Sequence, residues 1–165
     1  MKLPICVFDA KTGMLCSNCK VKLEDGEITS EDVEISKVLV KFSSNKTLQK
    51  AKFYNSIDTP KLMIIIGDST LKTSLQNQQI ADALIKAGKK PYEVVVKEGT
   101  LKDTLTSLFA PVEVSGIDEI FVPDGTKEIR INLRGSENDL PLRADDLILI
   151  SSKVTSSYIR LSFIS

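Results

Sequence analysis

Hydrophobic residues recur along residues 29–98 with spacings that alternate between those of helices and those of strands. Between Val33 and Phe42 the spacing is helical, and Thr29 offers a hydroxyl cap ahead of acids in the first turn. Residues 62–66 are continuously apolar, which is typical of a buried strand. The predicted elements are a helix over 29–43, strands over 51–57 and 61–66 that form a hairpin, a helical region over 70–87 that is broken near 75–78, and a strand over 91–97.

The same order of elements recurs over residues 99–165. Gly116 indicates a bulge in one strand, and Pro123-Asp124-Gly125 is a tight turn between two strands. The predicted elements are a helix from Thr100 that Pro111 closes, strands over 112–122 and 127–133, a polar loop over 135–139, a helix over 142–152 and a strand over 158–164. This repeat of arrangement, rather than of sequence, predicts an α+β fold with domains at residues 29–98 and 99–165.

All three cysteines lie near the amino terminus, and an aspartate takes the place of a fourth. The pattern is Cys6-x2-Asp9-x6-Cys16-x2-Cys19. Three thiolates and a carboxylate can hold zinc in a near-tetrahedral site. Residues 1–28 have few apolar side chains, so burial alone would not fold them. We therefore predict a separate zinc-knuckle-like element at residues 1–28, in which one structural zinc ion supplies the stability.

Two other interpretations of the cysteines stay open. In the first, Cys6 is a buried core residue, and Cys16 and Cys19 are free or form a labile pair. In the second, the protein is a thiol redox protein that uses Cys16 and Cys19, which requires a helix amino terminus and a thioredoxin-like strand before it. The sequence gives no sign of that context.

The composition excludes several classes of function. Lysine and arginine number 22, aspartate and glutamate also number 22, and histidine is absent. There is thus no overall basic field to attract nucleic acid, and the commonest general base is missing. We therefore expect a non-enzymatic protein with no small-molecule substrate. We also expect it to be cytoplasmic with no membrane partner, because neither a signal sequence nor a membrane span is recognisable.

The order helix, strand, strand, broken helix, strand resembles that of the type II K-homology (KH) domain. Two such units with almost no linker, together with Leu108-Phe109-Ala110-Pro111-Val112 at the junction, are similar to the archaeal NusA-like transcription factors. The opening LPIC…LCSNC is similar to that of an archaeal subgroup with a cysteine-containing element before the KH pair. The resemblance implies a role in transcription elongation or termination, with RNA as a ligand.

KH domains hold RNA through a G-x-x-G loop, whose backbone approaches the phosphates closely. The corresponding positions here are residues 75–78 in the first unit and residues 135–139 in the second, and both lack the pattern. The expected partners are RNA, RNA polymerase or the ribosome, and the alternative is a protein–protein adaptor that does not bind RNA directly. The candidate RNA contacts are Lys37, Lys41, Lys72, Gln76, Asn77, Arg130, Arg134, Arg143 and Arg160.

Overall fold

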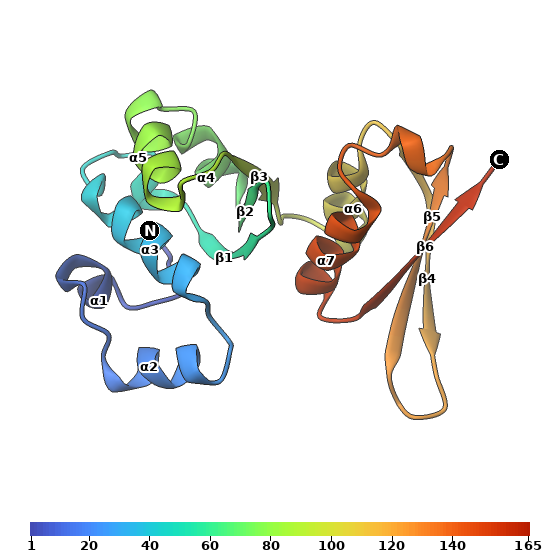
Figure 1. The fold of residues 1–165 in the computed structure, drawn as a ribbon, viewed down its shortest axis with the longest axis horizontal. Coiled ribbons are helices and arrows are strands. Elements are labelled where there is room, and N and C mark those ends of the chain that lie inside the picture. The colour runs from blue at the N-terminus through green and yellow to red at the C-terminus, as the bar shows by residue number, and fades with distance from the viewer. The chain divides into compact units, whose positions relative to one another are not determined.

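The computed structural model describes all residues from Met1 to Ser165, and the chain divides into two compact units (Figure 1). The first unit is Met1–Lys97 and the second is Glu98–Ser165. Seven α-helices and two three-stranded sheets make up the fold, one sheet in each unit. The predicted α+β class is therefore confirmed. The cysteine-containing segment belongs to the first unit.

The first unit contains one mixed sheet in the order β1-β2-β3. Strand β2 is central, pairs antiparallel with β1 and parallel with β3, and is buried along its whole length. The predicted hairpin with a buried second strand is thus confirmed. The elements are α1 (Val7–Thr12), α2 (Ser17–Glu24), α3 (Ser30–Lys41), a 3-10 turn (Leu48–Lys50), β1 (Phe53–Asp58), β2 (Met63–Gly67), α4 (Ser69–Ser74), α5 (Gln78–Gly88) and β3 (Tyr92–Val96).

Helix α3 is fixed at its start by a buried carboxylate. The predicted Thr29 cap is confirmed, and Asp32 completes it as a reciprocal capping box that was not predicted. The other oxygen of Asp32 accepts hydrogen bonds from the backbone N–H and the hydroxyl of Ser56 on β1, at 2.5 and 2.6 Å. The cap therefore also holds the helix against the sheet.

The second unit repeats this arrangement with the sheet order β4-β5-β6. Strands β4 and β5 are antiparallel, whereas β5 and β6 are parallel, as a helical crossover requires. The register shifts between Val114 and Gly116, where the bulge was expected. The elements are α6 (Leu101–Phe109), β4 (Glu113–Phe121), β5 (Lys127–Arg134), a 3-10 turn (Glu137–Asp139), α7 (Ala144–Thr155) and β6 (Tyr158–Ile164).

Helices α6 and α7 contact each other and lie on the same side of this sheet (Figure 1). The core between these layers consists of large apolar side chains from both helices and from the central strand. They include Leu105, Phe109, Ile129, Ile131, Leu133, Leu147 and Ile150. None of the seven helices is at once long enough and apolar enough to span a membrane.

Two local predictions need correction. No helix was predicted within the zinc-knuckle-like element at residues 1–28, but this segment contains two short helices, α1 and α2. Residues 135–139 were equated with the G-x-x-G position, but they directly follow β5 and include a 3-10 turn. The position that matches residues 75–78 by element order is 140–143, between that turn and α7. It also lacks glycine.

Candidate metal centre

Two helix starts bring the four candidate ligands together. Cys6 is the residue before α1 and Asp9 lies in its first turn, while Cys16 is the residue before α2 and Cys19 lies in its first turn. A separation of three residues places both members of each pair on the same side of a helix start. Between the helices, Gly13 ends α1 in the left-handed conformation, with φ 77°, which glycine adopts without a steric penalty.

The four ligand atoms form one compact cluster. One sulfur or oxygen atom from each of the four residues lies within 4.8 Å of every other, so the four side chains could hold a metal ion. The Cys6 sulfur lies 3.9 Å from that of Cys16 and 3.7 Å from that of Cys19. Disulfide-bonded sulfurs are about 2 Å apart, so all three cysteines are free thiols.

Backbone N–H groups orient the carboxylate and one thiol. The N–H of Cys16 donates to one oxygen of Asp9 at 3.0 Å, and the N–H of Cys6 points at the Cys19 sulfur at 3.5 Å. Asp9 and Cys19 are only 1% and 2% exposed. The Cys16 N–H occupies one Asp9 oxygen, and a metal ion that displaces the thiol protons could bind the other.

The two buried groups have shifted pKa values. Hydrogen bonds from the Cys19 thiol and the Cys16 N–H hold the pKa of Asp9 below its ordinary value. Burial, followed by the hydrogen bond to Asp9, raises the pKa of Cys19 to about 12. Cys19 in this folded segment therefore holds its proton at neutral pH unless a metal ion displaces it.

These facts bear on both other interpretations of the cysteines. Cys6 is exposed rather than buried, which contradicts the interpretation of Cys6 as a core residue. For redox chemistry, Cys16 does stand at a helix amino terminus, but residues 13–16 form no strand. Cys19 also has a raised pKa, whereas a reactive cysteine needs a lowered one.

The predicted RNA contacts of the first unit lie in different surroundings. Lys37 forms an ion pair with Glu34 on the same helix at 2.7 Å, and Lys41 is exposed at the end of α3. Lys72 and Gln76 share the lining of an open hollow of about 200 Å³ beside β3. Asn77 caps α5, because its side-chain oxygen accepts hydrogen bonds from the first turn of that helix, so its side chain has a structural role.

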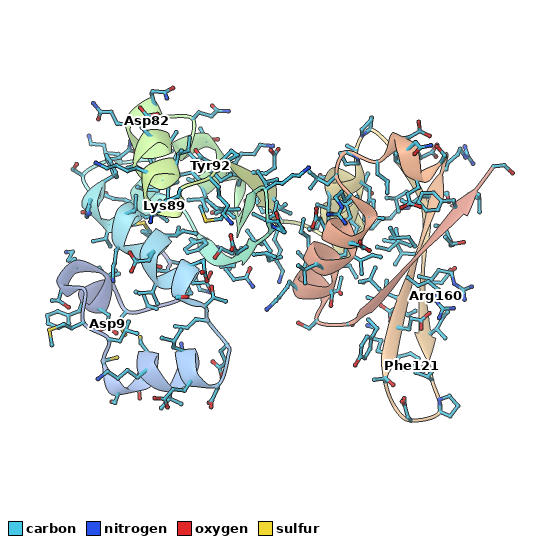
Figure 2. The ribbon with its side chains drawn as sticks, in the orientation of Figure 1. Asp9, Asp82, Lys89, Tyr92, Phe121 and Arg160 are labelled. Carbon is cyan, nitrogen blue, oxygen red and sulfur yellow. The ribbon has the colours of Figure 1, made fainter.

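Three of the four predicted arginines are paired with carboxylates. Arg134, Arg143 and Arg160 (labelled in Figure 2) form ion pairs of 3.1 to 3.4 Å. Their partners are Glu113, Asp145 and Glu128, respectively. Arg130 forms no ion pair, but it is in register with Arg160 on one side and Asp118 on the other. The sheet face that carries Arg130, Arg134 and Arg160 also carries Glu113, Asp118 and Glu128, so it has no net positive charge.

The sequence did not point to two side chains beside the metal cluster. Phe8 is 73% exposed and Met14 is 76% exposed, although both are large and apolar. Helix α1 buries Asp9 and Ala10, so a residue next to them in the chain faces outward. That inference needed the helix boundaries, which the sequence did not provide.

Comparisons with known proteins identify the fold but no family. No family model matches the chain, and no curated protein is similar enough to match it. Among solved structures, the crystal structure of APE1850 has a TM-score of 0.56 and 17% sequence identity, with 78% of this chain and 96% of that chain covered. At this identity the likeness shows a shared fold alone. Fold and site together define an α+β protein of two similar units with a four-ligand cluster at its amino terminus.

Proposed function

We propose that this protein is a NusA-like factor with two type II KH-like domains, which acts on RNA or on an RNA-containing machine during transcription elongation or termination. The observation that carries the proposal is the repeat of one arrangement. In each unit a helix precedes an antiparallel hairpin, and a helical crossover then leads to a third strand parallel to the central one. The junction motif and the cysteine-containing opening support the same assignment.

RNA binding in this proposal does not use the ordinary glycine loop. Residues 75–78 and residues 140–143 contain no glycine, so a side chain occupies the position where the RNA backbone would approach. The first position still has Lys72 and Gln76 beside an open hollow. We expect weak, salt-dependent binding that rests on a few charged contacts.

An adaptor on RNA polymerase or the ribosome, without direct RNA contact, is the second candidate. The pairing of Arg134, Arg143 and Arg160 with carboxylates favours it. Paired arginines at the surface have less positive charge to offer to a phosphate backbone.

The amino-terminal cluster, in this proposal, holds one structural zinc ion. A tetrahedral ion with zinc–sulfur bonds of about 2.3 Å has sulfur–sulfur edges of about 3.8 Å. The distances of 3.9 and 3.7 Å from the Cys6 sulfur agree with those edges. Three thiolates and the free Asp9 oxygen would fill all four positions, which leaves none open for catalysis.

RNA binding tests the main proposal. The full chain, purified with its metal, is titrated into labelled single-stranded RNA over a series of salt concentrations. We expect the logarithm of the association constant to fall linearly with the logarithm of the salt concentration. Absence of binding at low salt, together with co-purification of RNA polymerase or ribosomal subunits, would establish the adaptor instead.

Metal content tests the zinc site separately. We expect about one equivalent of zinc per chain, in keeping with a single four-ligand site. Cys19→Ser should lose the zinc, and Asp9→Ala should hold it more weakly. Three freely titrating thiols in reductively purified protein that contains no metal would refute the site.

A further inference from the structure

Two large apolar residues between the cluster ligands in the chain, Phe8 and Met14, face solvent. The Thr12 hydroxyl donates to the carbonyl oxygen of Phe8 at 3.0 Å, and the N–H of Met14 points at the same hydroxyl at 3.3 Å. One threonine thus brings the backbones of Phe8 and Met14 together. Phe8 and Met14 are the two most exposed large apolar side chains of the first unit. We call Phe8, Lys11 and Met14 the α1 patch.

The only exposed charge on α1 is positive. Lys11 is exposed, and Asp9, the one acid of this helix, is buried in the cluster (Asp9 is labelled in Figure 2). Lys11 lies three residues after Phe8 on α1, which places the two side chains as neighbours on the helix surface.

We propose that the α1 patch binds single-stranded RNA, with a base stacked on the Phe8 ring and the adjacent phosphate held by Lys11. The inference rests on the proposed function and gives it a contact site. An exposed aromatic ring next to unpaired lysines is the combination by which proteins hold single strands. Neither glycine loop can take this role, and the arginine-bearing sheet face of the second unit has no net charge.

A protein partner fits these observations less well. The centres of protein–protein interfaces are depleted in lysine and are built from several apolar side chains in a packed pocket. Here a single ring and one thioether stand beside the exposed Lys11, and α1 itself exposes no acid that could pair with a basic partner. Charge complementarity therefore favours a polyanion with flat bases.

The test uses the zinc-loaded full chain and a fluorescein-labelled single-stranded oligouridylate, followed by fluorescence anisotropy over a salt series. Phe8→Ala should weaken binding about tenfold, because loss of one stacked base has an effect of that order. Phe8→Tyr should retain binding. Lys11→Gln should reduce the slope of log affinity against log salt by about 0.7, the loss of one phosphate contact.

The chain offers a matched control for the ring. Phe121, labelled in Figure 2, is also 73% exposed but belongs to the second unit, so Phe121→Ala should bind as the unaltered chain does. Zinc content and far-UV circular dichroism of each variant show whether the fold is retained.

The possible outcomes separate this inference from the proposed function. If the unaltered chain binds RNA and Phe8→Ala binds equally well, the α1 patch is refuted while the proposed function stands. If the unaltered chain binds no RNA at low salt, direct RNA binding is refuted, and the α1 patch is refuted with it. If only co-purification of a protein is lost in Phe8→Ala, the patch is a protein contact and the inference is wrong.

Discussion

Removal of the metal ion should unfold α1 and α2 and leave the rest of the first unit folded. The two helices have only six and eight residues, whereas isolated helices shorter than about 12 residues are marginal in water. Their apolar support is small. Ile5, Ala10, Cys19 and Ile28 are the buried apolar residues of the segment, and they pack on Val33 and Val40 of α3.

The size of the effect follows from the helix lengths. Helices α1 and α2 hold fourteen residues, roughly a fifth of all residues in α-helices, so the helical circular dichroism signal should fall by about that fraction. The main core of the first unit is a different cluster that includes Leu39, Phe53, Ile65 and Leu84. It contains none of the four ligands, so the cooperative unfolding of the sheet should persist.

The assay is a chelator titration with three parallel readouts: zinc released, thiols titrated and far-UV circular dichroism. All three should change together, and re-addition of zinc should restore the signal. Cys19→Ser serves as the control, because it should show the reduced helix content before any chelator is added. Complete release of zinc with three reactive thiols and an unchanged spectrum would refute the claim that the ion folds this segment.

Three further predictions concern the folding stability of the two units. Asp32→Ala should lower the free energy of unfolding by about 3 kcal/mol, because the buried carboxylate accepts two hydrogen bonds from Ser56. Urea denaturation measures the free energy of unfolding, and a loss under about 1 kcal/mol would contradict the prediction. Gly67→Ala should lower the free energy of unfolding by about 2 kcal/mol or more in the same assay, because the added methyl group would lie 2.3 Å from the Leu71 side chain. An unchanged denaturation midpoint would show that α4, which carries Leu71, shifts freely. The hydrogen bonds of a helix cap lower the pKa of Asp103 below 3.8, so its contribution to stability is present above pH 3.8 and is lost as the pH falls through the lower, folded-state pKa. Thermal melts of Asp103→Asn should therefore show a melting temperature that depends less on pH in the acid range. Identical pH profiles for the variant and the unaltered chain would refute the assignment.

The elements from residue 29 onward could be predicted because their signals are local. The Thr29 cap, the continuous apolar run that became β2 and the bulge at Gly116 each depend on residues close together in the chain. Local hydrogen bonding and the alternation of apolar residues set such boundaries, and both can be recognised within a short stretch of sequence. The order of elements followed from them, and so did the α+β class.

Helices α1 and α2 could not be predicted in this way. Helix α2 buries a single residue, Cys19, and so shows no apolar stripe from which a helical period could be detected. Two of the candidate ligands stand at its start, because Cys16 is the residue before the helix and Cys19 lies in its first turn. The four candidate ligands were nevertheless identified, because their spacing along the chain is itself the signal, and the structure brings all four together.

The candidate RNA contacts show why residue type alone predicts a binding face poorly. The ion pair between Arg160 and Glu128 joins β6 to β5, two strands that are distant in the chain and parallel in the sheet. No short sequence window contains both partners, so this pairing could not be predicted, whereas Arg143 pairs with Asp145 only two residues away. Lys11 differs because the one acid of its helix, Asp9, is buried in the cluster. A lysine on a helix that exposes no acid is therefore a better guide to a surface that stays charged after folding than a count of basic residues on predicted strands. This criterion directs attention to the α1 patch.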